Sequence, residues 1–250
     1  MPIVKCTIAY DGTNFNGYQV QPGKRTVQGE LEKVLEKVHK GISVRVHASG
    51  RTDTGVHAKG QTIHFETELT IPGNSWKKAL NALLPNDIYI LDSEIAQESF
   101  HARYDVVEKE YRYYILMKQE PDIFNRHYIH HFPYPLNVEA IQEACTELEG
   151  THDFTTFSSA KATVKGDKIR TLFEVSCNQD NDRLEFIFRG SGFLYNMVRI
   201  LVGTLLDVGQ GRTHPTDIHQ MLEARDRSLA GKTAPAHGLY LWKVTYRNPE

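Results

Sequence analysis

Apolar residues recur every three or four positions in several stretches of the chain, which is the spacing of a helix with one buried face. This spacing predicts helices at residues 27–39, from Ser75 to a stop at Pro85, from Asn137 to a closing Gly150, and at residues 216–224. Thr26, Ser75 and Asn137 are suitable N-caps for three of these helices. Residues 193–207 are apolar almost all round, so the helix predicted there should be buried.

Other stretches alternate apolar with polar residues, or are rich in β-branched and aromatic residues, as strands are. They predict strands at residues 3–10, 43–48, 61–68, 87–91, 110–117, 170–177, 183–189 and 239–246. Because several strands follow one another without a helix between them, antiparallel pairing is favoured. We therefore expect an α+β fold, in which two similar sheet-plus-helix halves join into one mostly antiparallel sheet with helices on one side.

A proline-rich segment separates the two halves. Residues 119–136 contain Pro121, Pro133 and Pro135 together with several histidines and aromatic residues, and they are interpreted as a connector. The first half then spans residues 1–118 and the second spans residues 137–250. A chain of 250 residues suits one large domain or two modest ones.

The composition is that of an ordinary globular protein, with 40% hydrophobic and 24% charged residues. Its 3 cysteines are widely spaced and form no CxxC pair, which argues against a disulfide framework and against a zinc site. The first residues do not resemble a signal peptide, and the most apolar stretch, 193–208, is too short and too polar for a membrane span. We expect a protein of the reducing cytoplasm.

The net charge of −2 does not by itself indicate a nucleic-acid-binding protein. Positive charge is nevertheless gathered locally, at residues 41–60, 161–170 and 189–206. Such patches can attract phosphate whatever the net charge is. Ordinary solvated faces explain these charges equally well.

The most informative segment is the loop around Asp53, between two predicted strands. Residues that turn sharply, hydrogen-bond or carry positive charge surround it: Ser49, Gly50, Arg51, Thr52, Thr54, Gly55 and His57. Glycines let a ligand approach the backbone closely. A neighbouring arginine keeps a carboxylate ionised at neutral pH, because the opposite charge stabilises the charged form. An ionised carboxylate is what a nucleophile or a general base requires.

Two other interpretations of Asp53 remain open on these residues alone. Asp-Thr-Gly is good turn chemistry between strands, and most such turns have no catalytic role. Asp-Thr-Gly is also the core of aspartic protease sites, where two carboxylates share a proton. This chain has one such motif, so a protease would need a second carboxylate from another subunit.

A longer match favours a different function. Residues 48–58, which read Ala-Ser-Gly-Arg-Thr-Asp-Thr-Gly-Val-His-Ala, resemble the signature of the TruA family of tRNA pseudouridine synthases. Further matching blocks follow in order along essentially the whole chain: residues 10–13, 15, 17–19, 21, 26–28, 81–85, 87–88, 100–104, 109–113, 150–154, 157–158, 193–199, 233–235 and 238–239. Tyr18 stands where the family commonly has tryptophan, and Thr54 where it commonly has alanine.

The resemblance implies a pseudouridine synthase-like fold and a reaction. The family isomerises uridine to pseudouridine at positions thirty-eight to forty of the tRNA anticodon stem-loop. No atom is gained or lost, so no cofactor is required. By the match, Asp53 is the essential carboxylate, Arg199 the active-site arginine and Tyr111 the active-site tyrosine. The ring of Tyr111 would stack on a base turned out of the helix, and its hydroxyl would assist removal of the C5 proton.

The residues give Arg199 and Tyr111 unequal support of their own. Arg199 is the only charge between Arg189 and Asp207, within a helix that should be buried. A buried charge is costly unless it is paired, and Asp53 is the proposed partner. Alternatively, Arg199 lies at the helix edge and reaches solvent. Tyr111 on its own is better explained as sheet packing.

The remaining implied contacts concern RNA. Arg51 and His57 would orient the flipped nucleotide or a phosphate. Lys161, Lys165 and Lys168 would contact the phosphate backbone, although solvated loop lysines explain them as well. The resemblance also implies a homodimer in which one tRNA contacts both subunits. The rival hypothesis is a non-catalytic RNA-binding module, which needs basic and aromatic surface but no Asp–Arg pair.

Overall fold

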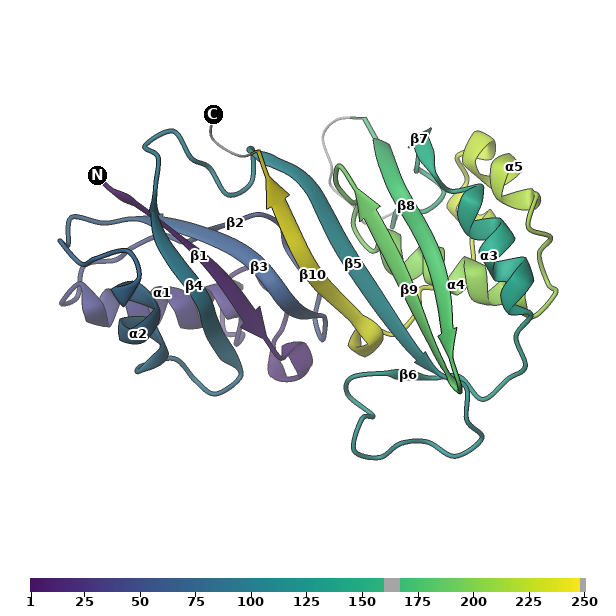
Figure 1. Ribbon diagram of the computed structural model, residues 1–250, viewed down its shortest axis with the longest axis horizontal. Coiled ribbons are helices and arrows are strands. Elements are labelled where there is room, and N and C mark those ends of the chain that lie inside the picture. Colours follow the sequence, from purple (N-terminus) through teal and green to yellow (C-terminus); the bar gives the residue numbers. More distant parts are fainter. Residues whose placement is uncertain (160–166, 248–250) are drawn as a thin grey trace. The chain divides into compact units, whose positions relative to one another are not determined.

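The computed structural model describes residues 1–159 and 167–247, which form two compact units (Figure 1). The first unit contains Met1–Val107 and the C-terminal residues from Tyr240 on, and the second contains Glu108–Leu239. The boundaries of these units differ from the boundaries expected for the two halves. The expected connector, 119–136, lies within the second unit, and the last strand of the chain belongs to the first.

The first unit is a mainly antiparallel sheet with two helices. Its elements are β1 (Ile3–Tyr10), the short 3-10 helix η1 (Gly12–Asn14), α1 (Val27–Val38), β2 (His47–Ala48), β3 (His57–Glu66), α2 (Ser75–Asn81), β4 (Ile88–Ala96) and β10 (Leu239–Tyr246). The strand order is β4-β1-β3-β10, and β2 also pairs with β3. The pairings of β1 are antiparallel, whereas β10 runs parallel to β3 (Figure 1).

Both faces of β3 are covered. On one face, the ring of Phe65 meets Trp76 of α2 edge-on at 5.1 Å, and Trp76 stacks on His39 at the end of α1. Successive side chains of a strand point to opposite faces, so the next one, His64, points the other way. There it contacts Phe100 and His101, in the loop that follows β4.

The described residues of the second unit form mainly antiparallel sheet strands and three α-helices. Its elements are β5 (Val106–Leu116, which begins at the end of the first unit), β6 (His130–His131), α3 (Val138–Thr146), β7 (Gly150–Asp153), β8 (Ile169–Asp180), β9 (Arg183–Gly190), α4 (Met197–Gly209), α5 (Asp217–Ala224), η2 (Arg227–Leu229) and η3 (Ala236–Gly238). The strands lie in the order β5-β9-β8-β7, and β6 pairs parallel with β5.

This sheet has one apolar and one charged face. Tyr111 lies opposite Phe188, Tyr113 opposite Phe186 and Ile115 opposite Leu184, and all six side chains are buried. The intervening residues carry ion pairs. Arg112 pairs with Glu110 on its own strand and with Glu185 on β9, and Arg189 pairs with Glu108 on β5 and Glu174 on β8. The α+β class with mostly antiparallel pairing, expected from the sequence, is confirmed.

The strand predicted at residues 43–48 is largely wrong, because only His47 and Ala48 pair with a neighbouring strand. Val44 and Val46 are buried, which explains the alternating pattern. The backbone of Val46 is bound by α1 instead. Its N–H donates to Glu32 Oε1 at 3.1 Å, and its carbonyl accepts from Gln28 Nε2 at 3.3 Å.

Several helix ends also differ from the predictions. Helix α3 ends at Thr146 rather than near Gly150. Gly150 has a φ of +103° and is the first residue of β7, a strand that was not predicted. Helix α4 begins at Met197 rather than at residue 193, because Asn196 has a left-handed φ of 59°. The caps at Thr26 and Asn137 are confirmed, since both side chains accept a backbone N–H. No helix in the described part of the chain is long and apolar enough to cross a membrane.

Candidate active site

Asp53 lies in a tight turn that connects β2 to β3. The ladder between these strands continues past β2 with Ser49 N donating to Thr62 O at 2.9 Å. The turn is then closed by Val56 N, which donates to Asp53 O at 3.1 Å, and Gly55 supplies the positive φ of 77°. Asp53 is half-buried, whereas Thr52 before it is buried. The turn therefore leaves Asp53 partly exposed above buried residues.

The buried residues beneath the loop include a set of polar side chains. The hydroxyls of Tyr10 and Thr52 lie 2.8 Å apart. Ser49 Oγ donates to Gln61 Oε1, and Gln61 Nε2 donates to Gly50 O at 2.8 Å. Burial raises the pKa of Tyr10 well above its ordinary value, so its hydroxyl stays protonated and can donate.

The segment after β1 holds the loop from its other side. Tyr18 N donates to Thr52 O at 3.0 Å, and Gly12 N donates to His57 Nδ1 at 3.0 Å. The backbones come so close that a Cβ on Gly12 would lie 2.0 Å from Val56 O. Only glycine fits at that position.

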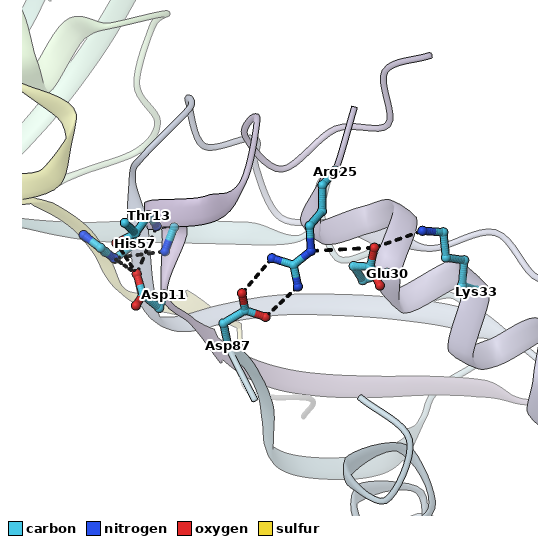
Figure 2. Close-up of polar contacts among 8 residues, drawn as sticks. Asp11, Thr13, Arg25, Glu30, Lys33, His57 and Asp87 are labelled. Carbon is cyan, nitrogen blue, oxygen red and sulfur yellow. Dashed lines mark hydrogen bonds and ion pairs between the residues drawn. The ribbon is translucent and has the colours of Figure 1, made fainter. Parts of the chain in front are cut away.

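An ion pair fixes this segment in turn (Figure 2). Arg25 forms a two-pronged bond to Asp87, at 2.7 and 2.9 Å, and Asp11 N donates to Asp87 O at 3.0 Å. The hydrogen bond to Asp87 raises the pKa of Arg25. Figure 2 also shows Thr13 and His57 pointing at the carboxylate of Asp11, with Thr13 N donating to Asp11 Oδ1 at 3.0 Å.

His57 is buried beside the loop, with 2% of its surface exposed. Its Nδ1 lies 3.0 Å from Gly12 N and 3.2 Å from Asp11 Oδ1. The Gly12 N–H donates to a lone pair on Nδ1, so we assign the ring hydrogen to Nε2. With this assignment the ring is neutral, and its contact with Asp11 is not an ion pair. The ring also stacks on Tyr240 of β10 at 4.7 Å. These contacts hold the end of the loop.

The other two predicted catalytic residues lie in the second unit. Tyr111 on β5 is 8% exposed, and its ring meets Phe193 edge-on at 5.0 Å. Arg199 in the first turns of α4 is half-buried. Its Nε donates to Ala234 O at 2.7 Å, and its Nη1 donates to Asn196 Oδ1 at 3.0 Å. The predicted pairing of Arg199 with Asp53, a residue of the first unit, stays a prediction.

Residues 231–238, which we term the strap, lie along α4 and fix Arg199. Gly231 N donates to Thr204 Oγ1 at 2.9 Å, and Ala234 N donates to Arg199 O at 3.0 Å. At the far end, the Tyr113 hydroxyl donates to Pro235 O at 2.8 Å. Because Arg199 both donates to and accepts from Ala234, the position of its side chain depends on the strap.

The basic residues expected to contact RNA are only partly described. Arg51 is exposed beside Asp53, and Lys168 is half-buried before β8. Lys161 and Lys165 lie outside the described residues. Within residues 1–159 and 167–247, no three His, Cys, Asp or Glu side chains are arranged to hold a metal ion.

The sequence did not single out the residues that support the loop. Tyr10 and Gln61 fit predicted strands, and Tyr240 fits another, so nothing in their pattern indicated a role near Asp53. The signal that could have found them is the polarity of Gln61 in a predicted strand, most of whose side chains are buried in the structure. A buried amide needs partners, and its partners here are in the loop.

Comparison with known proteins agrees with this geometry. Residues 7–105 and 144–247 match a family model described as tRNA pseudouridine synthase. Proteins named tRNA pseudouridine synthase A from Oceanobacillus iheyensis and Bacillus subtilis are 58% and 57% identical to the chain over 246 residues. Those residues are 98% of this chain, and 97% and 99% of the two relatives. The chain therefore belongs to the tRNA pseudouridine synthase family.

Proposed function

We propose that this protein isomerises uridine to pseudouridine at positions thirty-eight to forty of the tRNA anticodon stem-loop, with Asp53 as the essential carboxylate. The observation that carries the proposal is the rigid seating of Asp53. Its loop is held by the buried polar side chains beneath it, by the segment after β1 and by a positive-φ glycine, yet Asp53 is only half-buried. Catalytic groups need such preorganisation.

The reaction needs an ionised carboxylate and no added atoms. The N1–C1′ bond breaks, the uracil turns, and C5 bonds to C1′, while C5 loses a proton and N1 gains one. A carboxylate can attack C1′, attack the uracil ring or remove the C2′ proton, and each of these steps uses the charged form. The proposal therefore requires no cofactor.

The target base must leave the stem to be reached. We propose that Tyr111 stacks on the flipped base and assists removal of the C5 proton, and that Arg199 stabilises the Asp53 carboxylate. The bonds of Arg199 to Ala234 and Asn196 support a fixed position for its guanidinium. Arg51, which is exposed next to Asp53, would contact a phosphate or the flipped nucleotide. His57 would contribute to that contact from the end of the loop.

The proposed partner is tRNA, bound by a homodimer in the cytoplasm. A duplex stem offers mainly shape and phosphates, so binding should rest on the tRNA fold and on basic side chains such as Lys168.

The decisive test is Asp53→Asn, which keeps the shape of the side chain and removes its charge. We expect pseudouridine formation to fall by about 1,000-fold or more, while tRNA affinity changes little. The assays are tritium release from C5-labelled tRNA and an electrophoretic binding assay. Asp180→Asn, at an exposed position where β8 ends, is the matched control and should retain full activity.

Tritium release by Asp53→Asn at the wild-type rate would refute the proposal. A wild-type protein that binds tRNA but releases no tritium would instead support the rival hypothesis, a non-catalytic RNA-binding module.

A further inference from the structure

Four polar side chains beneath the Asp53 loop are almost completely removed from solvent. The exposed fractions are 4% for Tyr10, 0% for Ser49, 7% for Thr52 and 0% for Gln61. We term this set the loop network. Burying a polar group costs free energy unless it is hydrogen-bonded, and apolar residues of similar shape would avoid that cost. Four buried polar side chains at one place therefore indicate a role that apolar packing would not fulfil.

The loop network connects two strands to the loop. Tyr10 ends β1, and its hydroxyl lies 2.8 Å from that of Thr52 in the loop. Gln61 on β3 accepts from Ser49 and donates to Gly50 O. Successive parts of the chain that leads to Asp53 are thereby attached to the sheet. Fully satisfied buried networks of this kind rigidify a structure.

Thr52, the residue before Asp53, is held at two points. Its hydroxyl meets Tyr10, and its carbonyl accepts from Tyr18 N at 3.0 Å. The space around it is closely filled, since a Cβ on Gly17 would lie 2.9 Å from Thr52 O. With Thr52 fixed from both its side chain and its main chain, the backbone entering Asp53 has a defined position.

We propose that Tyr10 and Thr52 are positioning residues of the reaction. Their hydroxyl–hydroxyl bond holds the main chain so that the Asp53 carboxylate meets the target nucleotide in a reactive geometry. Neither residue contacts the substrate in this scheme, and both act through Asp53. The proposal rests on the proposed function, because it requires that Asp53 be the essential carboxylate.

Tyr18 offers a matched control. It is 3% exposed, and its ring lies beside that of Tyr10, with centroids 6.4 Å apart. Its hydroxyl is buried without a hydrogen-bond partner in the described structure. Tyr10→Phe and Tyr18→Phe thus remove the same atom from neighbouring buried rings. Only Tyr10→Phe breaks a bond to the loop.

The test is steady-state kinetics with C5-tritiated tRNA. Tyr10→Phe and Thr52→Val should each lower kcat by about 10- to 100-fold, because small misplacements of a reacting group are costly, with KM nearly unchanged. Tyr18→Phe should keep the wild-type kcat, and so should Thr52→Ser, which retains the hydroxyl. The double variant Tyr10→Phe/Thr52→Val should lower kcat no further than either single variant does, since the two substitutions break the same bond.

Thermal unfolding separates positioning from a purely structural role. Each single variant leaves one buried hydroxyl unpaired, so each should unfold at a lower temperature than the wild type. The double variant removes both hydroxyls and should recover part of the lost unfolding temperature. We expect kcat of the double variant to stay low despite that recovery. A kcat that follows the unfolding temperature across the series would overturn the proposal.

Asp53→Asn, assayed in parallel, separates this proposal from the proposed function. If Asp53→Asn remains active, the proposed function fails. If Asp53→Asn is inactive while Tyr10→Phe and Thr52→Val keep the wild-type kcat, the positioning role fails and the proposed function stands.

Discussion

Three imidazole rings lie in contact beside β3. The ring of His64 is 4.9 Å from that of His47 and 4.7 Å from that of His101, and Tyr104 stacks on His101 at 4.2 Å. His64 is buried, and its Nδ1 accepts from Ala102 N at 3.1 Å. Burial, and then the neighbouring imidazoles, lower the pKa of His64 to about 4. The protonated form of this ring is therefore disfavoured in the folded protein.

The shift makes the stability depend on pH. The ordinary pKa of histidine is 6.5, so between pH 6.5 and about 4 the unfolded chain binds a proton at His64 that the folded chain does not. Stability is fully present above this window and falls as the pH falls through it. His64→Gln should make the decrease in urea midpoint between pH 7 and pH 4 smaller.

His219→Gln is the control for this experiment, because the side chain of His219 is 59% exposed on α5. The part of the decrease that depends on His64 should remain in this variant. A wild-type slope in His64→Gln would show that His64 does not contribute. His130 in the second unit also has a pKa lowered to about 4, chiefly by burial, so part of the slope should remain.

At this scale the sequence identified the reactive group but not its support. Asp53 stood out because its neighbours carry hydroxyls, glycines and positive charge in one short run. The partners of the loop come from far along the chain: Tyr10 is 42 residues from Thr52. A strand pattern reports that such residues are buried, but it does not report which loop they meet.

Among the elements, the patterns that succeeded were those with local causes. Helix α1 has a side-chain cap at Thr26 and a single apolar stripe, and its observed bounds, Val27–Val38, match the predicted 27–39 closely. The strand prediction was wrong for residues 43–46, because alternation of apolar and polar residues indicates burial on one side and not pairing with another strand. There the side chains of α1 took the backbone bonds that a neighbouring strand would have taken.

The strap gives a prediction about an element. A Cβ on Gly203 of α4 would lie 1.7 Å from Lys232 O, so Gly203→Ala must push the strap away from the helix. Such overpacking typically costs about 1–3 kcal/mol of stability. Because Arg199 is bonded to Ala234 in the strap, kcat should fall as well.

The control for this prediction is Gly192→Ala, where the nearest atom to a new Cβ is 3.7 Å away, an ordinary contact. Its unfolding temperature should be that of the wild type. If Gly203→Ala unfolds at the same temperature as Gly192→Ala, then the strap is not packed on α4 as described.

For the whole molecule, the charge balance bears on how RNA is bound. A chain with a net charge of −2 does not attract phosphate uniformly, so basic surface must be concentrated. Two copies of the chain would combine their local basic residues around one tRNA, which is the homodimer proposed above. Light scattering should then give a mass near twice 28.5 kDa. A mass of 28.5 kDa at working concentrations would contradict the homodimer.

The return of β10 to the first unit also sets an order of events during synthesis. Tyr240 stacks on His57, and β10 pairs with β3, so the unit that carries Asp53 needs a strand that is synthesised after the second unit. Residues 58–239 must be translated in between, which takes about 10–40 s at roughly 5–20 residues per second. The loop of Asp53 therefore gains its final support only after β10 has been synthesised, so the first unit completes its folding after the second unit has been translated.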